Sequence, residues 1–442
     1  MKLYLIIATI LCTQLAFSQG TDSVATKTWT LEECINYALE NNITVKDASL
    51  YTNSAEIDLN TAKSARLPNL FGSASQRVSS GNTIDPITSD YVTDQNYSTN
   101  VGLNSSVVLF QGNQLNNQVK QSKLLFQQSQ FIEEEAKNNI VIGILQAYLQ
   151  TLYSKEDIAI SENNLAASEN ELQQAKAKLE AGSISLSELT DIQSQTATNK
   201  YNVISAKNNY QQNIIVLKQL LALQPSESLE IEIVEGDMEL INIELNSASI
   251  YNNALNNLPE LKSSELDIEI NEKALDIAKG AYLPSLTLNG SMTTGYTSVL
   301  NSSFRDQFNV NLNPQLAVTL SVPIFNRNRT KNAVQTASIN IERAQLQKQT
   351  TEKIIYQKVE TAYQNPVSSQ EQLIAAKASQ DAAEQSYDLA QKSFDLGGIS
   401  TTDLVLSQNI YTNAQQNYIQ AKYMNILYHQ LLQFYQGNDI KL

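Results

Sequence analysis

The sequence contains few of the residues that catalysis and metal binding need. Its 442 residues include two cysteines and one histidine, His429, so a metal cluster or a nucleophile–base pair cannot be assembled. Only Cys34 lies beyond the first residues, which excludes an intramolecular disulfide. We therefore predict no enzymatic activity, no metal and no cofactor, and we expect His429 to be a satisfied residue on a helix face.

Long apolar runs and clustered positive charge are also missing. After the first residues, no stretch of about 18 apolar residues follows, so we expect no transmembrane helix. The formal net charge is −15, and no basic patch is present to displace phosphate counterions, which argues against a nucleic-acid partner. A secreted chain of this kind is either soluble or enters an outer membrane as a β-barrel.

The first 18 residues have the pattern of a secretory signal. Lys2 supplies a positive start, residues 3–11 form a short apolar run, and Ala16-Phe17-Ser18 has the small-x-small pattern before a cleavage site. We therefore predict that the mature chain begins at Gln19. A lipid anchor on Cys12 is the less favoured alternative, because the leucine before it is a poor residue for such a site.

The chain repeats itself once at a nearly constant offset. Ala62-Lys-Ser-Ala-Arg-Leu-Pro-Asn-Leu70 recurs 216 positions later as Ala278-Lys-Gly-Ala-Tyr-Leu-Pro-Ser-Leu286, and the segment 181–189 recurs 215 positions later. We therefore predict a tandem duplication. Its parts are a signal at 1–18, a first repeat at 19–223, an inter-repeat linker at 224–246, a second repeat at 247–436 and a C-terminal tail at 437–442.

Each repeat is expected to contain a strand pair, at about 67–110 and about 283–325. From Val310 to Ile324 the even positions are apolar and the odd positions are mostly polar, which is the period of a two-faced strand. Strands of ten or more residues match the length that a tilted strand needs to cross a bilayer. A soluble sheet flanked by helices remains the alternative.

A long helical hairpin is expected after each strand pair, at about 113–223 and about 327–436. Residues 113–181 contain no proline, which allows about 100 Å of helix at 1.5 Å per residue. The second copy contains Asn365-Pro366, where we expect a kink or break. Apolar residues near both turns recur at steps of three and four, so each hairpin is predicted to be an antiparallel coiled coil.

The four predicted strands cannot form a complete structure in lipid. The two outer strands would leave backbone groups without partners, each at a cost of several kcal/mol. Closed symmetric rings solve this problem in general. Three copies would give twelve strands, although the sequence alone also allows two or four copies.

These features together resemble the TolC family of outer-membrane factors. The resemblance rests on the duplication, on the opening segment 29–42, on Ala-Lys-x-x-x-Leu-Pro before each strand pair, and on the turns Gly182-Ser-Ile-Ser and Gly397-Gly-Ile-Ser. It implies a homotrimer with a TolC-like α-helical barrel of coiled-coil hairpins and a 12-stranded β-barrel, to which each chain gives four strands.

The implied function is that of the outer-membrane channel in a tripartite efflux or type I secretion system. The resemblance implies outer-membrane lipid around the barrel, a periplasmic extension, a periplasmic adaptor, and an inner-membrane RND or ABC pump that supplies the energy. The competing interpretation is a structural or adhesive periplasmic coiled-coil protein without a pore.

The resemblance also implies a closed aperture at the hairpin tips. Asp403 matches an acidic position of the family, Glu188 and Asp191 occupy the equivalent places in the first repeat, and Phe394 matches an aromatic that is often Tyr. The turns expected to contact the adaptor contain Gly182, Ser183, Gly397 and Gly398.

Two departures from the family pattern put its charged contacts in doubt. Leu406 stands where the family has a second acidic ring, and Ile399 stands where it sometimes has Arg. In addition, Ser185-x-x-Glu188 and Ser400-x-x-Asp403 match capping boxes, in which the carboxylate bonds the free start of a helix. That structural role is the favoured explanation of both acids, and a cation-attracting ring is the functional hypothesis.

Overall fold

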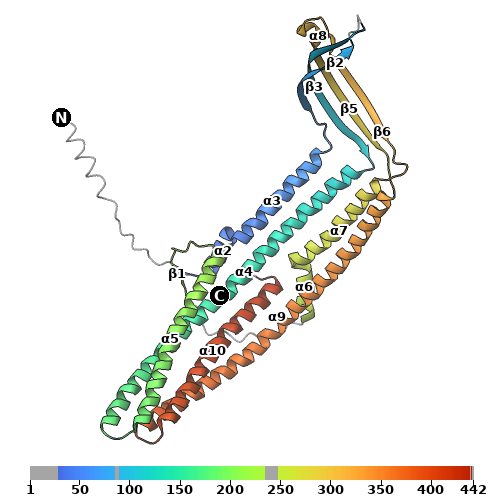
Figure 1. The fold of residues 1–442 in the computed structure, drawn as a ribbon. Coiled ribbons are helices and arrows are strands. Elements are labelled where there is room, and N and C mark those ends of the chain that lie inside the picture. Colours follow the sequence, from blue (N-terminus) through green and yellow to red (C-terminus); the bar gives the residue numbers. More distant parts are fainter. Residues whose placement is uncertain (1–27, 85–88, 234–246, 439, 441–442) are drawn as a thin grey trace, which may run out of the picture.

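The computed structural model describes residues 28–84, 89–233, 247–438 and 440. The predicted signal, most of the predicted linker and part of the predicted tail lie outside these residues. Figure 1 shows an elongated subunit, with a sheet at one end, long helices along its length and two hairpin turns at the opposite end.

The long helices follow the duplication. Both α4 and α9 contain 67 residues, and the helices that return from the two turns, α5 and α10, contain 36 residues each. The helices are α2 (Leu31–Asn41), α3 (Ile43–Ser64), α4 (Gln114–Glu180), α5 (Leu186–Leu221), α6 (Ser247–Asn257), α7 (Pro259–Gly280), α8 (Phe304–Val310), α9 (Arg329–Asp395) and α10 (Thr401–Gln436).

Helix α9 continues through Pro366 without a break. The missing N–H removes one helical hydrogen bond, but Pro366 is buried and α9 packs along α10 at this level, where the Asn425 Nδ2 donates to the Ser369 hydroxyl at 3.2 Å. The hydroxyl of Ser369 also donates to the Pro366 carbonyl at 3.0 Å. Of the predicted kink or break, the break is wrong, and the kink stays a prediction.

The larger sheet has four antiparallel strands in the order β2-β3-β5-β6. They are β2 (Phe71–Ile84), β3 (Tyr91–Gln111), β5 (Ser285–Thr297) and β6 (Asn313–Ser321). The alternation that starts at Val310 does not mark the start of the last strand: Val310 ends α8, and β6 begins at Asn313.

A hydrophobic core near the middle of the helices connects distant parts of the chain. It contains Cys34 from α2, Tyr148 from α4, Leu217 from α5, Ile231 from the strand β4 (Glu230–Ile231) and Ile440 near the C-terminus. Strand β4 pairs in parallel with β1 (Thr28–Trp29). The start of the linker and the end of the chain are thus fixed against α4.

The lone histidine lies on a helix, as predicted. His429 is buried in α10, and burial lowers the pKa of its imidazole, which is therefore neutral at pH 7. No group of three or more His, Cys, Asp or Glu that is able to hold a metal occurs among the described residues. In the same part of the chain, none of the helices combines the length and apolar character that crossing a membrane requires.

Candidate transport pathway

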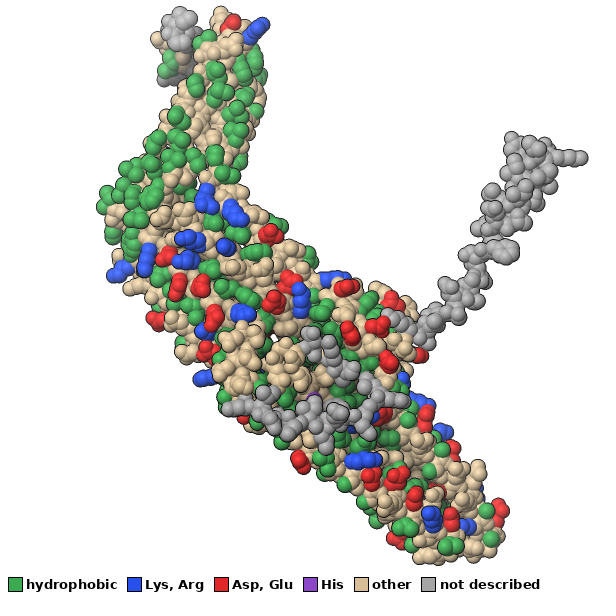
Figure 2. Space-filling view, turned by 180° about the vertical axis from the view of Figure 1, so that it is seen from behind, with side chains coloured by type: hydrophobic (Ala, Val, Ile, Leu, Met, Phe, Trp, Pro, Cys, Tyr) green, Lys and Arg blue, Asp and Glu red, His purple; other side chains and the backbone are tan. Residues whose placement is uncertain are grey.

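One face of the four-stranded sheet is apolar and exposed. The strand register places Val107, Leu288 and Val318 side by side on this face. Leu316 and Val318 on β6 are 77% and 62% exposed, and Figure 2 shows hydrophobic side chains spread over the sheet, with charged side chains concentrated over the helices. Burial of apolar area contributes about 25 cal/mol per Å², so this face favours an apolar environment over water.

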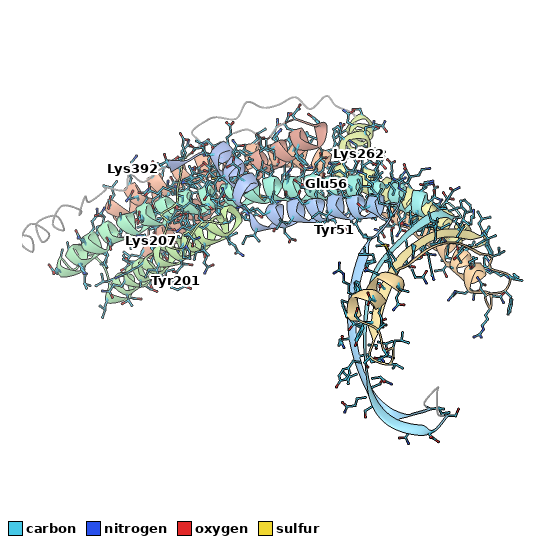
Figure 3. All side chains as sticks on the ribbon, turned by 90° about the horizontal axis from the view of Figure 1, so that it is seen from above. Tyr51, Glu56, Tyr201, Lys207, Lys262 and Lys392 are labelled. Carbon is cyan, nitrogen blue, oxygen red and sulfur yellow. The ribbon has the colours of Figure 1, made fainter. Side chains whose placement is uncertain are left out.

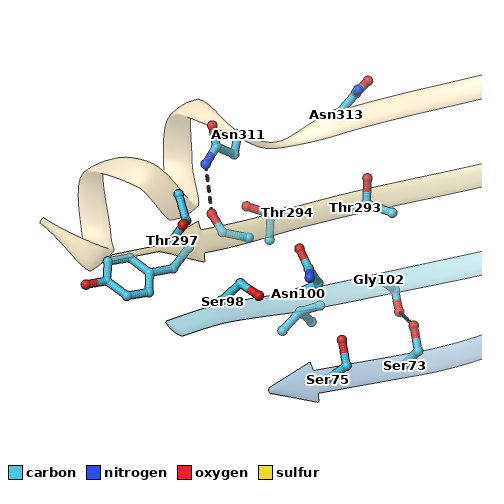
Figure 4. A pocket seen from close by; sticks show the side chains of 13 residues that line it. Ser73, Ser75, Ser98, Asn100, Gly102, Thr293, Thr294, Thr297, Asn311 and Asn313 are labelled. Carbon is cyan, nitrogen blue, oxygen red and sulfur yellow. Dashed lines mark hydrogen bonds between the residues drawn. The ribbon is translucent and has the colours of Figure 1, made fainter. Parts of the chain in front are cut away.

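The opposite face of the sheet is polar and hollowed. Register aligns Ser73, Gly102, Thr293 and Asn313 across the four strands, and Figure 4 shows their polar atoms around a shared hollow. At the distal end, the Asn311 Nδ2 donates to the Gly295 carbonyl at 2.8 Å. Hydroxyl and amide groups of this kind suit a water-filled passage, because they exchange hydrogen bonds with water without carrying charge.

Strands β2 and β6 form the two edges of the sheet. In the described sheet, β2 pairs with β3 alone and β6 pairs with β5 alone. Each edge therefore presents a row of backbone groups that point away from the sheet. In lipid these groups need partners from outside this chain.

Both hairpin turns have a glycine in the left-handed region, with φ of +73° at Gly182 and +74° at Gly397. At the first turn, the Ser183 N–H donates to the Lys178 carbonyl at 2.8 Å, which closes the last turn of α4. At the second, the Gly398 N–H donates to the Ser393 carbonyl at 2.7 Å. Glycine is used here because a side chain would strain a positive φ.

The two predicted capping boxes are confirmed. The Glu188 N–H donates to the Ser185 hydroxyl at 3.2 Å, and the Ser185 N–H donates back to the Glu188 carboxylate at 2.6 Å. These bonds from Ser185 lower the pKa of Glu188. Ser400 and Asp403 make the same pair of contacts at the start of α10. Asp403 in the first turn of α10 and Asp191 in the second turn of α5 are exposed and carry negative charge into the solvent.

Phe394 lies inside the subunit, beneath the turns. Its side chain is 4% exposed, in a cluster with Ala175, Ile192 and Leu404. The Lys178 Nζ lies 4.1 Å from the centroid of the phenyl ring and also donates to the Phe394 carbonyl at 3.0 Å. A cation–π contact thus stands where a tyrosine would offer a hydroxyl.

The sequence did not predict a buried contact between the two hairpins. The Tyr387 hydroxyl on α9 donates to the Glu171 carboxylate on α4 at 2.7 Å, and Glu171 is 3% exposed. Burial raises the pKa of Glu171, and the bond from Tyr387 offsets part of that rise. Glu171 thus differs from most acids on a long helix, which face water. The position of Tyr387 could be read from the sequence, because it follows the steps of three and four that connect Ala383, Ala390 and Phe394.

An amphipathic, open-edged sheet carried on a column of coiled-coil hairpins defines the subunit of an outer-membrane channel. The family model described as outer membrane efflux protein matches residues 34–223 and 250–430, and the chain belongs to that family. The predicted fold class and family are thereby confirmed.

Other proteins resemble this chain at low sequence identity, by sequence or by fold. Nodulation protein T of Rhizobium leguminosarum bv. viciae is 21% identical over 351 residues, which cover 78% of this chain and 70% of that protein. The structure of the Campylobacter jejuni CmeC outer membrane channel superposes with a TM-score of 0.82 at 19% identity, covering 92% of this chain and 85% of that one. A CusC structure gives 0.79 at 18% identity, covering 92% of both.

Family membership settles the class of function. The protein is an outer-membrane efflux channel subunit with a periplasmic extension, a passive conduit rather than an enzyme. Members of the family are trimeric channels that work with adaptors and inner-membrane pumps. The alternative interpretation, a periplasmic coiled-coil protein without a pore, is set aside.

Proposed function

We propose that three copies of this chain close into one 12-stranded barrel in the outer membrane and one helical tunnel in the periplasm. The observation that carries the proposal is the sheet, with its apolar face, its polar face and its two open edges. Pairing β6 of each subunit with β2 of the next satisfies both edges, turns the apolar face to lipid and encloses the polar face.

The proposed partners are a periplasmic adaptor and an inner-membrane RND or ABC pump, for efflux or type I secretion. The hairpin turns lie at the end of the subunit farthest from the sheet (Figure 1), where such partners would meet the tunnel. Gly182 and Gly397 have open space where a side chain would project, and Ser183 and Gly398 stand beside them. We assign these four turn residues to adaptor contact.

The proposed aperture lies at the same end. Three copies of the outward-facing acids Glu188, Asp191 and Asp403 would give a ring of negative charge that attracts cations. Phe394 would act from within each subunit, by holding the two hairpins together below the turns.

Neighbouring residues on β6 test the orientation of the sheet. Val318 belongs to the apolar face and Thr319 to the polar face, near the middle of the strand. Val318→Arg places a charge in lipid, at a cost of about 2–4 kcal/mol per subunit, and should strongly reduce membrane-inserted trimer. Thr319→Arg should insert normally and instead reduce the conductance for cations in planar bilayers.

The two variants are compared by membrane fractionation, trimer migration on gels and bilayer conductance. Equal insertion of both variants, or loss with Thr319→Arg alone, would refute the assigned faces. A wild-type protein that is monomeric in water without detergent would refute the channel itself.

A further inference from the structure

Within the subunit, α4 packs along α7 through a ladder of three glutamines. The glutamines are one heptad apart on α4, and each side-chain amide donates to a backbone carbonyl of α7. The pairs are Gln114 to Ile277 at 2.9 Å, Gln121 to Ile270 at 3.3 Å, and Gln128 to Ser263 at 3.1 Å. These uncharged contacts fix the register of the two antiparallel helices, and we call the α4–α7 contact the internal seam.

The duplication supplies a second copy of both sides of this seam. Helix α9 repeats α4: each has 67 residues and follows an Asn with φ +60°. Helix α3 repeats α7, and each has 22 residues. The positions equivalent to the three glutamines are Arg329, Thr336 and Arg343, and those equivalent to their partners are Thr61, Ser54 and Asp47.

These second copies do not meet in one chain. Helix α3 leads into β2 and α9 follows β6, and those strands are the opposite edges of the sheet. In Figure 3, the labelled side chains of Tyr51 and Glu56 mark α3 along the outer border of the helices. Arg343 and Asp47 are both exposed, whereas their equivalents Gln128 and Ser263 are partly covered by each other's helix.

Apolar side chains show the same difference between the copies. On α3, Ile43, Leu50 and Ile57 recur every seven residues and are 76%, 66% and 65% exposed. On α9, Ile339 and Leu346 are 56% and 62% exposed. Their equivalents on α4, Leu124 and Phe131, and Leu266 on α7 are half-buried in the internal seam. A surface that is covered in one repeat and bare in the other needs the same kind of helix to cover it.

We infer that α9 of each subunit packs on α3 of the next copy in the register of the internal α4–α7 seam, which places Arg343 beside Asp47. This inference rests on the proposed trimer and adds its register and its chemistry. Arginine is longer than glutamine, so its guanidinium reaches past the backbone carbonyl to the aspartate carboxylate. The internal ladder uses three neutral amides, whereas the ladder between subunits contains one ionic pair, Arg343 with Asp47, so charge at these two positions affects assembly.

Paired cysteines in the full-length mature protein test the register. With a short bismaleimide, Asp47→Cys/Arg343→Cys should give covalent dimers and trimers on denaturing gels. The matched control, Gln128→Cys/Ser263→Cys, should react within one chain and remain at monomer mass. Native Cys34 is buried and common to all variants.

A second cysteine pair, shifted along α3, tests whether the register itself is correct. Ser54→Cys/Arg343→Cys is displaced by one heptad, about 10.5 Å along the helix, and should link several-fold less. If the shifted pair links as well as the first, or if the first does not link in a protein that native mass spectrometry shows to be trimeric, the register is wrong while the channel stands. A protein that is monomeric throughout overturns both the seam and the proposed function.

Charge exchange tests the ionic contact separately. Arg343→Asp places two carboxylates together and should lower the trimeric fraction several-fold, and Asp47→Arg should do the same with two arginines. The double variant Asp47→Arg/Arg343→Asp should restore the trimer, with helical circular dichroism unchanged in all three. A double variant no more trimeric than the weaker single one overturns the pairing of these residues.

Discussion

The contact between Tyr387 and Glu171 joins the two hairpins near their tips, and we expect its removal to open the channel. Tyr387→Phe deletes the donor of a 2.7 Å bond and leaves the buried Glu171 carboxylate without it. A hydrogen bond to a charged group contributes about 1.5–3 kcal/mol. That free energy shifts the balance between joined and separated hairpins roughly 10- to 150-fold in each subunit.

The assay is the open fraction of single channels in planar bilayers. The matched control is Tyr411→Phe, because Tyr411 stacks on Tyr387 and also donates to a carboxylate, that of Glu384, but at 3.2 Å on an exposed surface. We expect a large rise in open fraction for Tyr387→Phe and almost none for Tyr411→Phe. Equal effects of the two variants, or no effect of Tyr387→Phe, would refute the assignment of a closing role to the buried bond.

The same contact predicts a dependence on pH. The pKa of Glu171 is raised in the folded protein, so between its ordinary and raised pKa the folded state binds more protons than the unfolded chain. The contribution of Glu171 to the free energy of unfolding therefore falls as pH rises through that window. Tyr387→Phe removes the bond that lowers the pKa of Glu171, so that pKa should rise further. The loss of stability should then continue to higher pH. Denaturant titrations at a series of pH values would record this.

Two further predictions concern the turns. Asp403→Ala should weaken cation preference in bilayers and also remove the carboxylate side of the capping box, while the N-cap Ser400 remains. Asp403→Asn keeps a side-chain oxygen that can accept from the Ser400 N–H, so it isolates the effect of charge. Unchanged selectivity in both variants would reject the charged ring. Gly397→Ala should destabilise the tip by about 1–2 kcal/mol through the positive φ of residue 397 alone, because nothing lies within 4 Å of the added methyl. A much larger loss of stability in thermal unfolding would contradict this account.

Local and periodic features of this fold could be predicted from the sequence. The capping boxes at Ser185 and Ser400 depend on residues three positions apart, and the stripe containing Tyr387 depends on heptad spacing. Helix α8 was missed because seven residues are too few to show a helical period. Its one signal was Ser303-x-x-Asp306, where the Asp306 N–H donates to the Ser303 hydroxyl at 3.1 Å.

Contacts between the hairpins could not be predicted in the same way. Glu171 and Tyr387 are 216 residues apart, and an acid on a long helix ordinarily faces water. Only the relative placement of α4 and α9 shows that this carboxylate is buried. The continuity of α9 through Pro366 was missed for a related reason, since the packing of α9 along α10 is not visible in the residues around the proline.

Two of the buried or partly buried acids that join the hairpins, Glu156 and Glu171, differ in how their negative charge is balanced. Glu156 of α4 accepts from both the Tyr423 hydroxyl at 2.7 Å and the Lys422 ammonium at 2.9 Å, so a cation offsets its charge. Glu171 has the Tyr387 hydroxyl but faces the negative charge of Asp395, which raises its pKa further. An acid without a balancing cation is held less firmly once water can reach it. Separation of the hairpins should therefore begin at the tip and stop before it reaches Glu156. The middle of the tunnel would then stay fixed.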